Sequence, residues 1–368
     1  MDVVLDQGTG KAPRFYAPQF RFRIGGKELH EEAGDVLSVQ FKDSIKDLAA
    51  VELVLNNVRH TSRSESPTYK YSDGGDPIDL GKQFELEMGY ADAPKMQRML
   101  QGEVIAFDPQ FPPTGSSTLV VRGLDLLHRL RNQPKTKSWE KKTDAEIAGE
   151  IARENGFGAL IDSTKERHDV VPQDNKDDIS FLLERAKRLD FEVFLRDGDL
   201  HFVHTREGNS PVLTLEYGKS LMSFAPSLTL ARQVSKVTVR CWHPIEGRLI
   251  EKSATRAKLN DLKQKGKNAG EVLESAFGKG KEEVILKEAV LSDEEAQTLA
   301  ESVLRRNAHS FVTGSGQTVG IPSLRAGVNI ELKGLGKRFD GAYYVTESTH
   351  RIDQSGYQTT FSVRKAYA

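Results

Sequence analysis

The chain has 368 residues, and its 52 Lys and Arg nearly balance its 53 Asp and Glu, which gives a formal net charge of -1. This length predicts two or three domains, each large enough to bury its own core, and the balanced charge excludes a general attraction to nucleic acid or to an anionic membrane surface. The single cysteine excludes an internal disulfide and a cysteine-based zinc site.

The N-terminal end predicts an extended arm without a targeting signal. Residues 1–18 are mostly polar and contain two glycines and two prolines, which favour an extended chain. The first residues are acidic and lack the basic and apolar segments of a signal peptide. No run of about 18 apolar residues, the length of a membrane-spanning helix, occurs in the chain. We therefore expect a soluble cytoplasmic product, or one that some other machine exports.

Residues 19–130 predict a sheet, and residues 131–208 predict a small α/β insert. In the first region, apolar side chains alternate with polar ones, and this period of two indicates strands with one buried face. In the second region, Thr143 and Glu146 form a capping-box pattern that marks the start of a helix. A second helix is expected from about Asp178, followed by a hairpin that turns at Asp197-Gly198.

Residues 209–368 return to strands, interrupted by one helix that Ser292 and Glu295 would cap. Within this region, the lysine-rich stretch 251–283 predicts a mobile polar insertion with room for a partial helix.

The two β-rich ends resemble each other in the order and spacing of their strands. Three segments of the first end, 84–87, 102–105 and 117–122, correspond in order to 330–333, 341–345 and 359–364 of the second. Their common order indicates a duplicated β-domain. The alternative is that two unrelated antiparallel sheets share this general appearance.

No residue pattern identifies a catalytic, cofactor-binding or metal-binding site. The nine histidines are scattered, and the closest two, His201 and His204, would point to opposite faces of a strand. The glycine-rich segment 314–320 has neither the spacing of a dinucleotide loop nor the lysine of a phosphate-binding loop. Asp and Glu are abundant, so a pair of catalytic carboxylates stays open as an alternative.

One local charge feature is the basic stretch 122–142, which carries seven basic and two acidic residues. It is interpreted as a solvated linker. The alternative is an electrostatic contact with an acidic partner surface or with nucleic acid, although only Trp139 offers an aromatic ring for stacking.

Several segments, in their order along the chain, resemble the late control protein D family of contractile phage tails. They are similar as well to the N-terminal part of the valine-glycine repeat spike proteins of type VI secretion. The resemblance covers the chain from about Phe20 to Arg364, and the segments that carry it are 123–130, 141–147, 178–186, 191–198, 320–327 and 334–345.

This resemblance implies a mainly β (α+β) fold, with two similar tube-like antiparallel β-barrel domains that flank the small α/β insert. It further implies a homotrimer, because members of the family assemble as trimers. Three copies with two similar barrels each would present six near-equivalent barrels to a six-fold tail tube and a three-fold face to the spike.

The function expected from the resemblance is that of a structural hub in the baseplate of a phage tail or contractile injection system, without enzymatic activity. The expected partners are the inner tube protein, baseplate wedge components and a spike that is a separate chain, since the sequence ends at Ala368. Such a virion component would be assembled in the bacterial cytoplasm. The alternative function is a tail-associated cell-wall hydrolase on a β-barrel scaffold.

The assembly surfaces are predicted at open strand edges, because unpaired edges favour pairing with another chain. We expect the strands 83–90 and 329–333 to lie near such edges. The candidate interface residues on them are Glu85, Glu87, Glu331 and Lys333.

Overall fold

The computed structural model describes residues 17–29, 35–59, 68–72, 78–91, 95–131, 133–243, 245–255, 266–278 and 280–368. The predicted arm 1–18 lies outside the described residues except for its last two positions, where the first strand begins at Pro18. None of the helices in the described part of the chain is both long and apolar enough to cross a membrane.

The N-terminal third of the chain forms a set of six strands, which we call the N-terminal set. Their spatial order is β3-β4-β9-β8-β7-β1, and every neighbouring pair is antiparallel. A short strand β2 (Lys27–Leu29) extends the set beyond β1, and β5 (Val58–Arg59) pairs with β6 (Thr68–Tyr69) apart from it. The six strands are β1 (Pro18–Ile24), β3 (Val36–Ser44), β4 (Ala50–Asn56), β7 (Gln83–Tyr90), β8 (Gln97–Gln110) and β9 (Thr118–Asp125).

The C-terminal part of the chain forms a second set of six strands, the C-terminal set. Their spatial order is β16-β20-β23-β22-β21-β15. An isolated bridge between Tyr217 and Leu221 links the end of β15 to the start of β16. The six strands are β15 (Leu213–Glu216), β16 (Leu221–Leu228), β20 (Val312–Val319), β21 (Asn329–Lys333), β22 (Gly341–Asp353) and β23 (Gly356–Lys365).

The two sets repeat one topology. Taken in chain order, β1, β3, β4, β7, β8 and β9 occupy the same spatial positions as β15, β16, β20, β21, β22 and β23. The pairing of β8 with β9 shifts register between Val104 and Ala106, and the pairing of β22 with β23 shifts at the equivalent place, between Val345 and Glu347. One strand differs, because β1 runs antiparallel to β7 whereas β15 runs parallel to β21. The predicted mainly β fold is thus confirmed.

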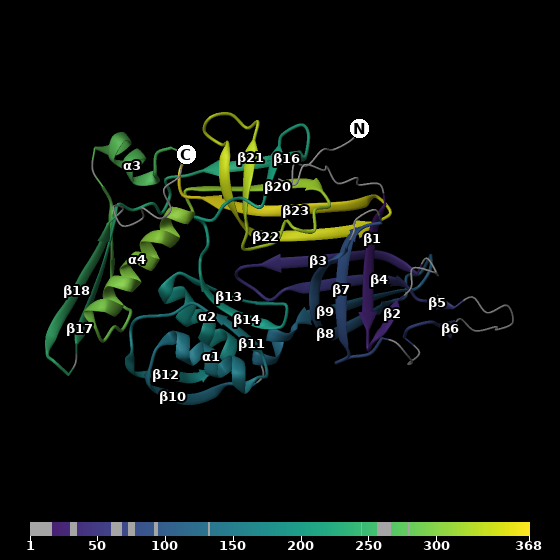
Figure 1. The fold of residues 1–368 in the computed structure, drawn as a ribbon, viewed down its shortest axis with the longest axis horizontal. Coiled ribbons are helices and arrows are strands. Elements are labelled where there is room, and N and C mark those ends of the chain that lie inside the picture. Colours follow the sequence, from purple (N-terminus) through teal and green to yellow (C-terminus); the bar gives the residue numbers. More distant parts are fainter. Residues whose placement is uncertain are drawn as a thin grey trace.

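The two sets are not separate sheets. The first residues of the long strand β22 pair with β21, and its second half pairs with β3, from Glu347 opposite Ser44 to Asp353 opposite Ser38. One sheet of 13 strands therefore runs through the molecule, as Figure 1 shows at its upper right. The sets also share a core, since Ile352 and Tyr357 of the C-terminal set pack into the hydrophobic cluster of the N-terminal set.

Residues 131–208, which we call the insert domain, contain two helices and five strands. Helix α1 (Asp144–Glu154) begins with the predicted capping box of Thr143 and Glu146. Helix α2 (Asp178–Leu189) follows, and its N-cap is Asp177. Both helices pack with Trp139 into one core. The strands are β10 (Lys135–Lys142), β11 (Gly158–Ile161), β12 (His168–Lys176), β13 (Phe191–Arg196) and β14 (Asp199–His204), preceded by a 3-10 helix, η2 (Leu126–Arg131).

The hairpin of β13 and β14 turns where the sequence predicts. Asp197 and Gly198 have φ angles of 54° and 91°, the left-handed conformation that a two-residue hairpin turn requires and that Asp-Gly tolerates.

The predicted polar insertion 251–283 is wrong in its bounds. It begins inside a hairpin of β17 (Lys236–His243) and β18 (Arg248–Thr255), and residues 256–265 lie outside the described part of the chain. Strand β19 (Glu282–Ile285) pairs with β17, and helix α4 (Asp293–His309) covers this sheet and shares its apolar core. The capped helix α3 (Ala269–Phe277) lies between β18 and β19. The insertion is therefore part of a helix-backed unit, seen at the left of Figure 1.

Candidate functional site

The predicted interface strands are interior strands. β7 pairs with β1 on one side and with β8 on the other, and β21 pairs with β15 and β22. Neither strand is itself an open edge, because residues 18–24 and 213–216 contribute the strands β1 and β15 that cover them. Whether the four predicted side chains contact another chain stays a prediction.

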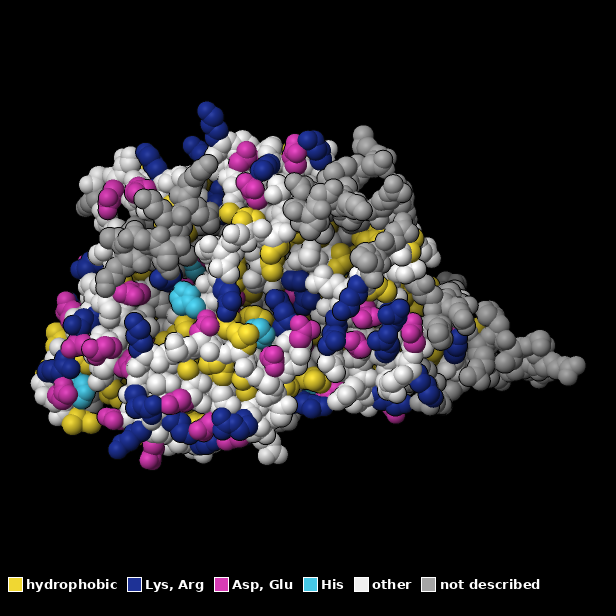
Figure 2. Space-filling model, viewed as in Figure 1, with side chains coloured by type: hydrophobic (Ala, Val, Ile, Leu, Met, Phe, Trp, Pro, Cys, Tyr) yellow, Lys and Arg dark blue, Asp and Glu magenta, His cyan; other side chains and the backbone are white. Residues whose placement is uncertain are grey.

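Glu85 and Glu87 lie in a surface ladder of charges on the N-terminal set. Glu85 forms ion pairs with Arg98 at 2.9 Å and with Arg23 at 3.2 Å, and Glu87 pairs with Arg21 at 2.8 Å. Figure 2 shows Lys, Arg, Asp and Glu side chains interleaved over the region where Figure 1 labels β7 and β1. This face therefore offers both signs of charge to a neighbouring surface.

Glu331 and Lys333 lie on the same face of β21, two residues apart. The Lys333 Nζ is 3.5 Å from the Glu331 carboxylate, and the side chains of Lys333 and Glu331 are 53% and 39% exposed. Exposed pairs of this kind contribute little to stability, about 0–1 kcal/mol. Both groups are therefore free to exchange this contact for one with a partner.

Within the described residues, three strands of the main sheet pair on one side only, namely β16 and β2 at the ends of the long strand path and β15 beside β21. In the described part of the chain, β16 hydrogen-bonds along its length to β20 alone, and the side chains of Met222, Ser223, Ala225 and Ser227 are exposed. These ends are the edges at which pairing with a further strand is geometrically open.

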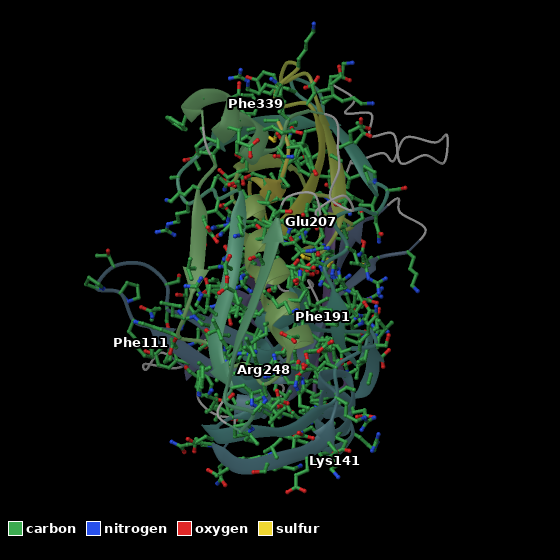
Figure 3. The ribbon with its side chains drawn as sticks, turned by 90° about the vertical axis from the view of Figure 1, so that its left-hand side faces the viewer. Phe111, Lys141, Phe191, Glu207, Arg248 and Phe339 are labelled. Atoms are coloured by element: carbon green, nitrogen blue, oxygen red, sulfur yellow. The ribbon has the colours of Figure 1, made fainter. Side chains whose placement is uncertain are left out.

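The insert domain is fixed to the C-terminal set by a buried cluster of charges around Glu207. His309 Nε2 lies 3.0 Å from one Glu207 oxygen, and Arg364 Nε donates to the other. Tyr344 donates a hydrogen bond of 2.6 Å to Glu192 on β13, and the Arg364 guanidinium lies over the Tyr344 ring. In Figure 3, Glu207 lies near the middle of the molecule, between the C-terminal set and the insert domain.

Burial and charge act in opposite directions within this cluster. Burial on its own would raise the pKa of Glu207, but the charges of His309 and Arg364 outweigh burial and hold that pKa at about 2. Burial dominates for Glu192 and raises its pKa to about 7, against the hydrogen bond from Tyr344. The cluster therefore holds one firmly ionised carboxylate and one carboxyl that titrates near neutrality.

The two carboxyl groups whose pKa burial raises to about 7, Asp125 and Glu192, are each engaged in hydrogen bonds. Burial raises the pKa of Asp125 to about 7, but its two oxygens accept hydrogen bonds from the backbone N–H groups of Ala49, at 2.8 Å, and Leu127, at 3.0 Å. Glu192, the other carboxyl with a pKa near 7, is engaged by Tyr344. Each group is committed to a structural contact.

One cluster that sequence reasoning missed is formed by Glu166, His168 and Glu295. One ligand atom of each residue lies within 4.8 Å of the others, the spacing of a possible metal site. Glu166 accepts a hydrogen bond from Ser292, and Glu295 pairs with Arg188 at 2.9 Å, so the carboxylates already have protein partners. The contact joins the insert domain to α4, and residues so distant in the sequence carry no local spacing signal.

The basic stretch 122–142 is largely neutralised within the fold. Six of its seven basic side chains form ion pairs, which leaves little of its charge for a nucleic-acid contact. The linker interpretation is wrong, because the stretch forms the end of β9, η2 and β10. The pairs are Arg122–Glu52, Arg129–Glu103, Arg131–Asp47, Lys135–Asp178, Lys137–Glu154 and Lys142–Glu150.

The repeated strand sets and the insert between them are the fold of bacteriophage tail proteins. The chain superposes on a 43 kDa tail protein of prophage MuSo2 from Shewanella oneidensis with a TM-score of 0.70 at 15% identity, covering 95% of this chain and 99% of that chain. It superposes on a tail protein from Neisseria meningitidis MC58 with a TM-score of 0.69 at 13% identity, covering 95% and 97%. It superposes on a component of the type VI secretion system of E. coli with a TM-score of 0.57 at 12% identity, covering 96% of this chain and 78% of that chain.

The family follows from the sequence. The family model described as Alg8 N-terminal domain matches residues 17–354, and the chain belongs to this family. No curated protein matches the chain. The expected likeness to phage tail and type VI proteins is confirmed in the fold.

Proposed function

We propose that this protein is the structural hub of a phage tail baseplate or contractile injection particle. Three copies form a ring that joins a six-fold inner tube to a three-fold spike. The observation that carries the proposal is the strand order that repeats between the N-terminal and C-terminal sets. Two similar sets per chain give a trimer six similar sets, which matches a six-fold ring on one face. A permanent ring contact of this kind buries on the order of 2,000 Å² or more.

The partners follow from this position in the particle. The inner tube protein lies against the ring of six strand sets, a separate spike protein lies against the three-fold face, and wedge components surround the hub. The fold shared with prophage tail proteins and with a type VI secretion component supports this placement. The protein is assembled in the bacterial cytoplasm and becomes part of the particle.

The role is one of protein–protein packing without catalysis. Support comes from Asp125 and Glu192, whose perturbed carboxyl groups are bonded to the backbone and to Tyr344. A hydrolase would need two such groups to converge on one open cleft. A peptidoglycan zymogram of the purified protein should accordingly remain blank, and a cleared band would support the hydrolase instead.

The oligomeric state tests the hub directly. Size-exclusion chromatography with light scattering should give three times the 41.0 kDa mass of the chain, and electron microscopy of the assembled particle should place it between tube and spike. A strict monomer at high concentration, absent from the end of the tube, would overturn the proposal.

A further inference from the structure

A cavity of about 550 Å³ lies where three parts of the molecule meet. The N-terminal set contributes the start of β8 with Arg98, the insert domain contributes the tip of the β13–β14 hairpin with Arg196 and Asp197, and the C-terminal set contributes the loop before β21 with Arg325. In Figure 1 the hairpin extends from the insert domain toward the N-terminal set. Met99 and Leu195 line part of the remaining wall, together with polar side chains that include Lys95, Gln97 and Gln101.

The arginines of this cavity differ in whether a carboxylate neutralises their charge. Arg325 forms a buried ion pair with Asp43 at 2.6 Å, and Arg98 pairs with Glu85 at 2.9 Å. Arg196 donates a hydrogen bond of 3.1 Å to the carbonyl oxygen of Ala326. None of the carboxylates that the structure describes comes within 4.0 Å of the Arg196 guanidinium.

Arg196 is therefore a partly buried cation without an ion-pair partner among the described residues. Burial lowers its pKa, and the neighbouring charge of Arg325 lowers it further. Asp43 serves two guanidinium groups at once, because it is bonded to Arg325 and attracts Arg196 from a greater distance. A charge held in this way favours a further anion, since an unpaired buried charge is costly.

The acidic groups on the cavity wall do not supply that anion. Both oxygens of Asp125 are occupied by backbone N–H groups, and Glu87 is paired with Arg21. Asp197 lies at the exposed tip of the hairpin, 3.8 Å from Arg98.

We propose that this cavity binds an acidic peptide segment of a partner protein, with a carboxylate on Arg196 and an apolar side chain against Met99 and Leu195. A guanidinium is planar and offers paired N–H donors that match the two oxygens of a carboxylate. The apolar wall favours a peptide over a free inorganic anion, because an inorganic anion leaves that wall without a contact. This inference goes beyond the hub function, and it requires no particular oligomeric state.

The test is fluorescence anisotropy with a labelled, end-blocked peptide Leu-Glu-Leu-Asp-Leu and its amide counterpart Leu-Gln-Leu-Asn-Leu. The acidic peptide should bind the full chain, and the amide peptide should bind at least about tenfold more weakly, because a charge-assisted pair is lost. Inorganic phosphate should compete only far above the concentration of the acidic peptide.

Variants locate the site. Arg196→Gln should weaken binding of the acidic peptide about tenfold, and Arg98→Gln should weaken it less. Asp197→Asn should strengthen binding about two- to fivefold, because it removes a negative charge at the mouth and keeps a residue that tolerates the left-handed turn. A misfolded protein would not produce that gain. Arg351→Gln, an identical change at an exposed arginine paired with Asp353, is the control and should change nothing.

Three results would overturn the proposal. The first is equal binding of the amide peptide, and the second is equal competition by phosphate at peptide concentrations. The third is unchanged binding in Arg196→Gln and Asp197→Asn, with thermal melts that verify folding of both variants. A monomeric protein that passes the peptide test would refute the hub and leave this site standing.

Discussion

Arg325 and Asp43 form a buried ion pair across the boundary between the two strand sets, with the Arg325 Nε 2.6 Å from an Asp43 oxygen and both side chains about one-tenth exposed. The Arg325 guanidinium also lies over the ring of Phe41, 4.7 Å from its centre. The two residues are 282 positions apart in the chain. The pair therefore ties the loop before β21 to the end of β3.

Removing one member of this pair should lower the free energy of unfolding more than removing both. Arg325→Met or Asp43→Asn should each lower the free energy of unfolding by about 3–5 kcal/mol, because each leaves an unpaired buried polar group. The double variant should lose less than the sum of the two. Denaturant unfolding gives all four values, and Arg351→Gln at the surface serves as the control. Strictly additive losses would contradict the direct coupling.

The stability contributed by Glu192 should depend on pH. Burial raises the pKa of this carboxyl from about 4.5 to about 7, so the folded protein holds the proton more tightly than the unfolded chain does. The contribution is fully present below pH 4.5 and is lost as the pH rises through 7. Glu192→Gln keeps an acceptor for Tyr344 and removes this loss.

Between pH 4.5 and pH 8, the free energy of unfolding of Glu192→Gln should therefore rise by about 3 kcal/mol relative to that of the wild type. Urea unfolding at a series of pH values measures this difference. Glu347→Gln, at an exposed carboxylate 3.6 Å from Lys42, is the matched control and should follow the wild type. Parallel pH profiles of all three proteins would show that Glu192 titrates normally.

Gly123 should not accept a side chain. A Cβ atom there would lie 2.2 Å from the Phe84 ring, which stacks on Phe22 in the N-terminal core. Gly123→Ala should therefore lower the free energy of unfolding by about 2–3 kcal/mol, because that core has to rearrange around the new methyl group. Gly149→Ala in α1 is the contrasting control, with its nearest neighbour at 3.4 Å, and should stabilise the protein by up to about 1 kcal/mol. Equal melting temperatures of the two variants would be the contrary result.

Charge reversal at the predicted interface should act on assembly more than on folding. Glu85→Lys or Glu331→Lys should shift the trimer toward monomer, because a complementary contact between copies becomes repulsive. Light scattering at several protein concentrations measures the shift. The protomer should lose about 1 kcal/mol or less, since surface ion pairs contribute little. Glu347→Lys, on β22, is the control, and an unchanged trimer in both test variants would remove these residues from the interface.

Local structure was predictable wherever the signal was local. The capping box of Thr143 and Glu146, and the turn at Asp197-Gly198, depend on residues adjacent in the chain, and the structure has both. The repeated order of strands was visible as well, because equivalent strands keep similar spacing in the two halves. Such signals depend on backbone hydrogen bonding within a few residues.

Long-range pairing was not predictable. Nothing in residues 347–353 indicates that they pair with β3, about 300 positions earlier, and nothing in the predicted interface strands indicates that β1 and β15 cover them. The insertion 251–283 was misread because its polar surface hides the helix-backed unit, whose apolar face is supplied by α4 and β17. The charge cluster of Glu207, His309 and Arg364 joins three separate segments, so no spacing in the sequence points to it.

Strand β22 sets a mechanical property of the molecule. Its 13 residues are shared between the two strand sets, and at about 3.3 Å per residue they form a rod of about 43 Å. A hinge between the two sets would have to break the hydrogen bonds that join β22 to β3 and β23. The register shift between Val345 and Glu347, where β22 passes from one set to the other, marks the place at which the strand should bend under load.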